Sequence, residues 1–159
     1  MSAIDGDFDD DSDWDCDDVN ALTAEIAGGT NDLSFDLNGD GSVDTGDLDD
    51  WLAEAGAINN ASGGAYLPGD TNLSGFVDVN DFRIWSNNKF SNNTSWCSSD
   101  LNADGSVGVA DFNIWNNYKF QSSDGTRPVP VPEPNCVLIL LAVFVVFMRA
   151  CKVDFQFKV

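Results

Sequence analysis

The sequence contains no histidine, and its first 50 residues contain neither lysine nor arginine. Without an imidazole, the chain has no Ser-His-Asp or Cys-His catalysis, no histidine-ligated zinc and no histidine acid–base chemistry. Basic residues are scarce throughout: 7 Lys and Arg stand against 27 Asp and Glu in 159 residues, a formal net charge of −20. Because so negative a surface repels phosphate backbones, the composition argues against nucleic-acid binding.

Apolar residues nevertheless form 43% of the chain and aromatic residues 11%. These shares are too large for a solvated acidic tail with nothing to bury. A folded chain of this composition needs a counter-charge for its carboxylates. Carboxylate oxygens are hard ligands, so a hard divalent cation is the first candidate.

The acidic residues belong to an internal repeat. Residues 70–90 match residues 100–120 at an offset of 30, and the same frame begins at Asp36 and, in a more degenerate form, at Asp7. The repeat defines four loops of twelve residues, at 7–18, 36–47, 70–81 and 100–111. The chain is therefore read as a four-unit array.

Each loop continues into a stretch with helical spacing. Apolar residues stand one and four places after the loop and again about one turn later, which favours a helix of roughly ten residues with one buried face. These apolar residues are Val19, Leu22, Ile26, Leu48, Trp51, Ala55, Phe82, Trp85, Phe90, Phe112, Trp115 and Phe120. Gly28-Gly29 and Gly56 stand where the first two helices are expected to end. The expected fold is mostly α, with tandem loop–helix repeats in two pairs.

Within each loop, oxygen donors recur at positions 1, 3, 5, 9 and 12, glycine is favoured at position 6, and position 7 offers a backbone carbonyl. Calcium takes about six to eight oxygen ligands, and glycine permits the sharp turn that wraps them around one point. The candidate calcium ligands are Asp7, Asp9, Asp11, Asp13, Asp15, Asp18, Asp36, Asn38, Asp40, Ser42, Asp44, Asp47, Asp70, Asn72, Ser74, Phe76, Asp78, Asp81, Asp100, Asn102, Asp104, Ser106 and Asp111.

The loops are not equivalent as ligand sets. Loop 36–47 has every expected donor, whereas loop 70–81 has the neutral Ser74 at position 5 and loop 100–111 has Gly108 at position 9, where water must substitute. The first loop has Ser12 in place of glycine and eight Asp in twelve residues. Repulsion among these carboxylates is expected to leave the first loop disordered without metal.

The duplicated loop-then-helix unit with Asp at position 12 resembles a type I dockerin, a calcium-binding module built from EF-hand-like half-motifs (F-hands). The resemblance covers about residues 5–121. It implies Ca²⁺ as the cofactor, ligation by the loop residues given above, and a cohesin-like or other surface protein as partner. Position 8 is apolar in every loop, and in paired loops of this kind it forms a short strand-like contact with the partner loop. These residues are Trp14, Val43, Val77 and Val107.

The C-terminal part resembles a PEP-CTERM sorting signal. Val131 precedes the Pro132, Glu133 and Pro134 motif, and the apolar run 136–148 ends at Arg149. The resemblance implies processing by an exosortase-type membrane enzyme, with the run 136–148 as a transmembrane or sorting helix. The run alone spans only about 20 Å as a helix, so it crosses a bilayer only if its flanking residues are drawn in. A buried core helix is the alternative.

The expected domains are a first dockerin-like pair at 1–58, a linker at 59–69, a second pair at 70–121, a Pro-rich spacer at 122–134 and an anchor with a basic tail at 135–159. Basic residues after the anchor predict the array outside the cell, at the cell surface or in the extracellular space.

No secretory signal is recognised at the N-terminus, so we expect a truncated reading frame or the C-terminal piece of a longer exported protein. Cys16 and Cys97 either pair across the two halves in an oxidising compartment or remain as two thiols.

The expected function is a calcium-stabilised, non-enzymatic surface module for protein attachment or display. The alternative is the non-catalytic C-terminal part of a secreted polysaccharide-degrading glycoside hydrolase. A glycosidase carboxylate pair explains the periodic loop carboxylates less well than metal ligation does, and solvated turns do not keep a twelve-position register. Trp51, Trp85 and Trp115 serve either as core residues, which their helical spacing favours, or as sugar-stacking platforms.

Overall fold

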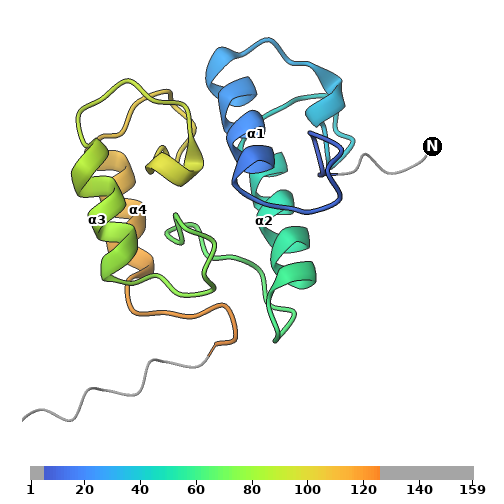
Figure 1. The fold of residues 1–159 in the computed structure, drawn as a ribbon. Coiled ribbons are helices and arrows are strands. Elements are labelled where there is room, and N and C mark those ends of the chain that lie inside the picture. The colour runs from blue at the N-terminus through green and yellow to red at the C-terminus, as the bar shows by residue number, and fades with distance from the viewer. Residues whose placement is uncertain (1–5, 126–159) are drawn as a thin grey trace, which may run out of the picture. The chain divides into compact units, whose positions relative to one another are not determined.

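Each of the four loops runs directly into a helix (Figure 1). The structure, a computed structural model, describes residues 6–125. These residues are mostly helical, lie in one compact unit and contain no sheet. The helices and the two short 3₁₀ turns are α1 Cys16–Gly28, η1 Leu33–Phe35, α2 Thr45–Asn59, α3 Val79–Asn88, η2 Trp96–Ser98 and α4 Val109–Tyr118.

Every helix begins at position 10 of its loop, two residues before the loop ends. At position 9, Asp15, Asp44 and Asp78 accept a hydrogen bond from the backbone N–H two residues ahead, which caps a helix N-terminus. The position-12 carboxylate accepts the N–H of position 9 in return. The last three residues of the loop are therefore also the first turn of the helix.

The two glycines expected to end helices behave differently. Helix α1 ends as predicted, because Gly29 adopts a left-handed φ of 65° and donates its N–H to the carbonyls of Glu25 and Ile26. Helix α2 instead continues through Gly56 to Asn59, so that prediction was wrong. A Cβ on Gly56 would lie 2.5 Å from the carbonyl oxygen of Gly64. The glycine is needed for the close approach of the linker backbone, and it does not end the helix.

Helices α1 and α2 pack on each other in the first pair of units, and α3 packs on α4 in the second (Figure 1). In the first pair the predicted core residues Val19, Leu22, Leu48, Trp51 and Ala55 are all buried. The indole N–H of Trp51 donates to a backbone carbonyl rather than facing solvent. Trp51 is therefore a core residue, as its spacing favoured.

The second pair is held by a cluster of four aromatic rings, most of them tilted relative to one another. Phe82, Trp85, Phe112 and Trp115 are half-buried, with the Phe82–Trp115 and Trp85–Phe112 ring centroids 5.1 Å and 5.0 Å apart. The next expected core positions are exposed: Phe90 and Phe120 are 76% and 58% accessible. Both residues have a left-handed φ, 64° and 62°, which turns the chain away from the helix axis and takes the ring off the buried face.

The chain that follows each helix of the second pair pairs with the loop of the other unit. The N–H of Phe120 donates to the carbonyl of Val77, and the N–H of Val77 donates to that of Gln121. The equivalent bonds run from the end of α3 to the fourth loop: the N–H of Phe90 donates to the carbonyl of Val107, and the N–H of Val107 donates to that of Ser91. Position 8 therefore bonds the segment beyond the partner helix, and the predicted contact of position 8 with the partner loop itself was wrong. The reason is that the partner chain re-enters beside the loop directly after its helix.

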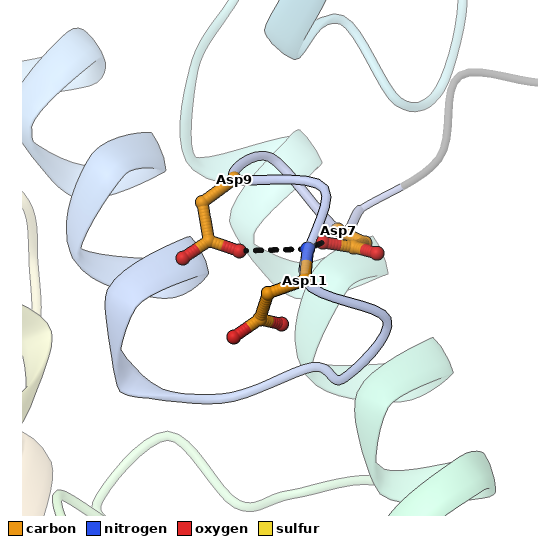
Figure 2. Close-up of side chains that lie close together, drawn as sticks. All are labelled: Asp7, Asp9 and Asp11. Atoms are coloured by element: carbon orange, nitrogen blue, oxygen red, sulfur yellow. Dashed lines mark hydrogen bonds between the residues drawn. The ribbon is translucent and has the colours of Figure 1, made fainter.

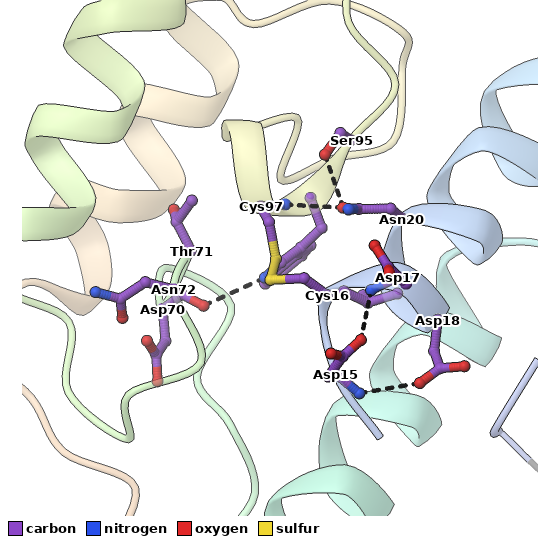
Figure 3. The surroundings of a disulfide bond; sticks show 12 residues. Asp15, Cys16, Asp17, Asp18, Asn20, Asp70, Thr71, Asn72, Ser95 and Cys97 are labelled. Carbon is purple, nitrogen blue, oxygen red and sulfur yellow. Dashed lines mark hydrogen bonds between the residues drawn. A yellow bond between two sulfur atoms is a disulfide. The ribbon is translucent and has the colours of Figure 1, made fainter. Parts of the chain in front are cut away.

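A disulfide joins the two halves of the described chain. Cys16 at the start of α1 is bonded to Cys97 in η2, with 5.9 Å between their Cα atoms (Figure 3). Asn20 reinforces the junction, because its Oδ1 accepts the N–H of Cys97 and the hydroxyl of Ser95. Trp96 is fully buried beside the disulfide. The periodicity of apolar residues in the sequence does not predict it as a core residue. The sequence left the pairing open, and the structure settles it as a disulfide.

No helix within residues 6–125 is long and apolar enough to cross a membrane. Most of the spacer, the Pro132-Glu133-Pro134 motif, the apolar run 136–148 and Arg149 lie outside the described residues. Their assignments remain predictions.

Candidate metal centres

The position-1 carboxylate organises each loop by accepting backbone N–H groups of positions 5 and 6. Asp70 accepts from Ser74 and Gly75 at 2.9 and 2.7 Å, and Asp100 accepts from Asp104 and Gly105 at 3.1 and 2.9 Å. The same bonds recur at Asp7 and Asp36. Three of the four position-1 residues are buried: Asp36, Asp70 and Asp100. The backbone of every loop is thus wrapped around its first aspartate.

The position-12 carboxylate closes each loop from the other end and is buried in all four. Besides the N–H of position 9, it accepts N–H groups near the start of its own loop. Asp18 accepts from Phe8, Asp47 from Asn38, Asp81 from Asn72, and Asp111 from Leu101 and Asn102. In the first, third and fourth loops the first and last aspartates lie close enough for the charge of one to raise the pKa of the other.

Two residues in each loop adopt a left-handed conformation. At position 6, Gly41, Gly75 and Gly105 have φ between 82° and 90°, as the glycine pattern predicts, and Ser12 in the first loop has a φ of 77°. At position 4 the left-handed residues include Leu73 and Ala103. The sequence does not predict this conformation for Leu73 and Ala103, because leucine and alanine do not favour positive φ. There the hydrogen bonds to the position-1 carboxylate overcome the local preference.

The first loop brings the most carboxylates together. The oxygens of Asp7, Asp9 and Asp11 lie within 4.8 Å of one another (Figure 2), and so do those of Asp13, Asp15 and Asp18. Such a group of oxygens can hold a metal ion. In the described part of the chain, the other three loops contain no such triad of acidic side chains. There, amides and hydroxyls replace several of the carboxylates.

In the second and third loops, side-chain oxygens at positions 3 and 5 turn toward backbone N–H groups. Asn38 Oδ1 accepts from Asp40, and Asp40 Oδ1 accepts from Ser42, each at 2.8 Å. Asn72 accepts from Ser74, whose own hydroxyl oxygen accepts from Phe76 at 3.4 Å. The hydrogen bond to position 5 is thus longer in the third loop than in the second; the weaker metal ligand expected at Ser74 remains a prediction.

The fourth loop lacks a donor at position 9, since Gly108 has no side chain to cap α4. Asn102 and Asp104 keep the pattern at positions 3 and 5: Asn102 accepts from Asp104 at 3.3 Å, and Asp104 accepts from Ser106 at 2.9 Å. This loop therefore keeps the geometry of the others with one oxygen fewer.

Burial has a cost for these carboxylates. Desolvation raises the pKa of Asp70 to about 7 and that of Asp100 to about 6, and the nearby charges of Asp81 and Asp111 add to the two increases. Desolvation also raises the pKa of Asp81 and of Asp111. In the first loop, desolvation followed by the charge of Asp11 raises the pKa of Asp9. These raised values mean that negative charge is disfavoured where the first and last aspartates meet.

A cation placed in a loop would reverse this cost. The donor set is all oxygen, with carboxylates at positions 1 and 12 and a mixture of carboxylate, amide and hydroxyl between them. Oxygen-only sets suit Ca²⁺, Mg²⁺ or Mn²⁺ and do not suit the softer metals that prefer sulfur or imidazole. The loop residues therefore fit a hard divalent ion.

Neither a protein-family profile, nor a characterised protein, nor a solved structure gives a significant match to this chain.

Proposed function

We propose that the chain is a calcium-binding, dockerin-like surface module whose fold depends on Ca²⁺. The observation that carries the proposal is the same hydrogen-bonded loop in four copies. In each copy a buried aspartate at position 12 accepts the N–H of position 9, and an aspartate at position 1 accepts the N–H groups of positions 5 and 6. Turn-forming segments do not need two inward carboxylates at a fixed spacing. An ion-binding loop does, because the two carboxylates supply the charge that neutralises the ion.

Calcium suits the loops better than magnesium. Side chains at positions 5 and 9 are exposed in the second loop, as Asp40 and Asp44 show, and a larger ion tolerates such a flexible arrangement of ligands. Magnesium demands a tighter octahedral set and retains its waters. Extracellular calcium is also plentiful enough for loops with neutral or missing donors, such as those with Ser74 and Gly108.

The setting we propose for this module is an exported protein that carries a PEP-CTERM-type sorting signal and displays the array at the cell surface. The Cys16–Cys97 disulfide supports an oxidising compartment. In this proposal the module serves attachment of another surface protein, and an exosortase-type enzyme processes residues 132–134.

Calcium titration of the full-length chain tests the proposal. We expect two to four sites by calorimetry and a gain of helical circular dichroism that a chelator reverses, with magnesium much weaker, because metal binding is coupled to folding. A chain that keeps its full helix content and melting temperature in EDTA, and ignores added Ca²⁺, would refute the proposal.

A double variant tests the ligand assignment. Asp36→Ala with Asp40→Ala removes two carboxylates from the loop with the full donor set, so we expect the tightest site to disappear from the calorimetric titration. Asp49→Ala with Asp50→Ala is a matched control, because it removes the same charge from the exposed side of α2. An unchanged number of sites in the loop variant would contradict the assignment.

A further inference from the structure

Two tryptophan indoles in the second pair each bond to the loop of the other unit. Trp85 in α3 donates its Nε1–H to the backbone carbonyl of Gly108 at 2.8 Å. Trp115 in α4 donates to the carbonyl of Asp78 at 2.9 Å. Both acceptors stand at position 9 of their loops. Since the two units match at an offset of 30, this is one contact made in both directions.

The residue that accepts the indole also orients a candidate metal ligand. The N–H of Asp78 donates to Asp81 Oδ2 at 2.7 Å, and the N–H of Gly108 donates to Asp111 Oδ2 at 2.6 Å. The same two carbonyls also accept helical N–H groups, at longer distances: Asp78 accepts from Phe82 at 3.4 Å, and Gly108 accepts from Phe112 at 3.3 Å. The indole therefore makes the shorter bond to position 9, and position 9 in turn holds the carboxylate at position 12.

These contacts close into a ring. On α3, Asp81 and Trp85 stand four residues apart and share one face, as Asp111 and Trp115 do on α4. The path runs from Asp81 along α3 to the Trp85 indole, then through position 9 of the fourth loop to Asp111. It returns along α4 through the indole of Trp115 and position 9 of the third loop to Asp81. Both position-12 carboxylates thus lie on one closed path made of four hydrogen bonds and one turn each of α3 and α4.

The first pair has no such ring. The indole of Trp51 donates to the carbonyl of Gly6, directly before the first loop, at 2.9 Å. The corresponding place in α1 is occupied by Leu22, which has no hydrogen to donate. In the first pair an indole therefore links the units in one direction only, and the reverse link is made by Asn31, whose side chain bonds Gly41 and Val43 of the second loop.

We propose that Trp85 and Trp115 are positioning residues that couple the third and fourth loops, so that a divalent ion bound in one loop raises the affinity of the other. The inference rests on the proposed calcium function. An ion that fixes the position-12 carboxylate of one loop fixes position 9 of that loop, and therefore fixes the indole and the helix that carry the carboxylate of the other. Coupling of this kind is reciprocal.

The test follows each loop separately in the full-length chain during a Ca²⁺ titration by NMR. The amides of Gly75 and Gly105 are the probes, because they donate to the position-1 carboxylates Asp70 and Asp100. In the wild-type chain we expect the two amides to titrate together and steeply. In Trp85→Phe we expect Gly105 to titrate at about tenfold higher Ca²⁺ than in the wild type, the loss of one hydrogen bond, while Gly75 shifts less. Trp115→Phe should reverse the order.

This pattern separates positioning from simple loss of packing. Trp85 lies on the helix after the third loop, yet its substitution should weaken the fourth loop, and Trp115, on the helix after the fourth loop, should affect the third. A β-(3-benzothienyl)alanine at position 85 keeps the ring shape without the N–H and should reproduce the Trp85→Phe result. Trp51→Phe is the matched control and should leave both probes unchanged.

If Ca²⁺ binds but the two amides still titrate together in both Phe variants, the coupling is refuted and the calcium function stands. If no loop of the wild-type chain binds Ca²⁺, both fail.

Discussion

At the scale of single residues, the loop aspartates do two jobs that oppose each other. They accept backbone N–H groups, which stabilises the loop, and they carry charge into a poorly solvated place, which destabilises it. Asp70 shows the conflict. Burial and the charge of Asp81 raise its pKa, whereas two backbone N–H groups lower it by a smaller amount. A bound cation resolves the conflict in favour of the charged form.

The raised pKa values predict how the stability of the metal-free chain depends on pH. Asp70 and Asp100 titrate at about 7 and about 6 in the folded chain and near 3.8 when unperturbed. A carboxylate whose pKa is raised by folding stabilises the fold below its unfolded pKa, and this contribution is lost as the pH rises through the folded value. In EDTA, we therefore expect the melting temperature to fall between pH 4 and pH 8.

Excess Ca²⁺ should reverse this trend, because the ion binds the deprotonated carboxylates. The control is Asp70→Asn, which should flatten the metal-free dependence. Thermal melts followed by circular dichroism across that pH range provide the measurement, and a metal-free melting temperature that rises with pH would contradict the argument.

At the scale of elements, loop and helix are one unit, because positions 10 to 12 belong to both. The residue at position 9 caps the helix in three units, and the position-12 carboxylate accepts its N–H in all four. Whatever fixes the loop therefore fixes the start of the helix. This shared turn explains why metal binding is expected to increase helix content rather than only to order the loops.

The fourth unit offers a gain-of-function test of that shared turn. Gly108 has an extended φ of −125°, and a Cβ there would meet only Asp111 Oδ2, at 3.9 Å. Gly108→Asp should supply both the missing cap, worth a few tenths of a kcal/mol, and a charged ligand, which should raise calcium affinity at this loop on the order of tenfold.

Calorimetry measures the affinity, and Gly108→Asn is the matched variant because it caps the helix without adding charge. We expect it to gain less affinity than Gly108→Asp. Equal affinity in the wild type and in Gly108→Asp would show that position 9 is not a ligand in this loop.

At the scale of the whole molecule, one buried core joins the halves, because Trp96 and Leu101 lie in the same hydrophobic cluster as Trp51. The disulfide and the Asn20 hydrogen bonds lie at one junction between α1 and η2 (Figure 3). Trp96, the first residue of η2, is buried and donates its backbone N–H to the hydroxyl oxygen of Thr23 in α1. Trp96 also donates its indole N–H to the carbonyl of Asp70, the first residue of the third loop, at 3.2 Å. The junction therefore touches a candidate metal loop of the second pair as well as the end of the first loop.

Removal of the disulfide should lower global stability more than any single loop substitution. Cys16 and Cys97 are separated by 81 residues, and closing a chain segment of that length is worth ~4 kcal/mol in the chain-entropy account. Urea unfolding of Cys16→Ser with Cys97→Ser, in excess Ca²⁺, should show this loss. The wild type in reductant should match the variant, and no change in the urea midpoint would mean that the bond does not constrain the unfolded chain.

The sequence by itself determined the local features. The twelve-residue register, the glycines at position 6, the aspartates at positions 1 and 12 and the helix after each loop all follow from preferences that act within about one turn. For that reason Gly41, Gly75 and Gly105 were identified correctly, as was the buried face with Val19, Leu48 and Trp51. The list of metal ligands also comes from this spacing, and it remains a prediction.

Only the tertiary structure decided which distant segments meet. It placed Phe90 and Phe120 in solvent, kept Gly56 inside α2, buried Trp96 at the junction and aimed each indole of the second pair at the other unit's loop. The physical reason is that these outcomes depend on contacts between different elements and segments, such as Gly56 with Gly64 and Trp85 with Gly108. The periodicity of residues within one helix or loop does not predict such contacts.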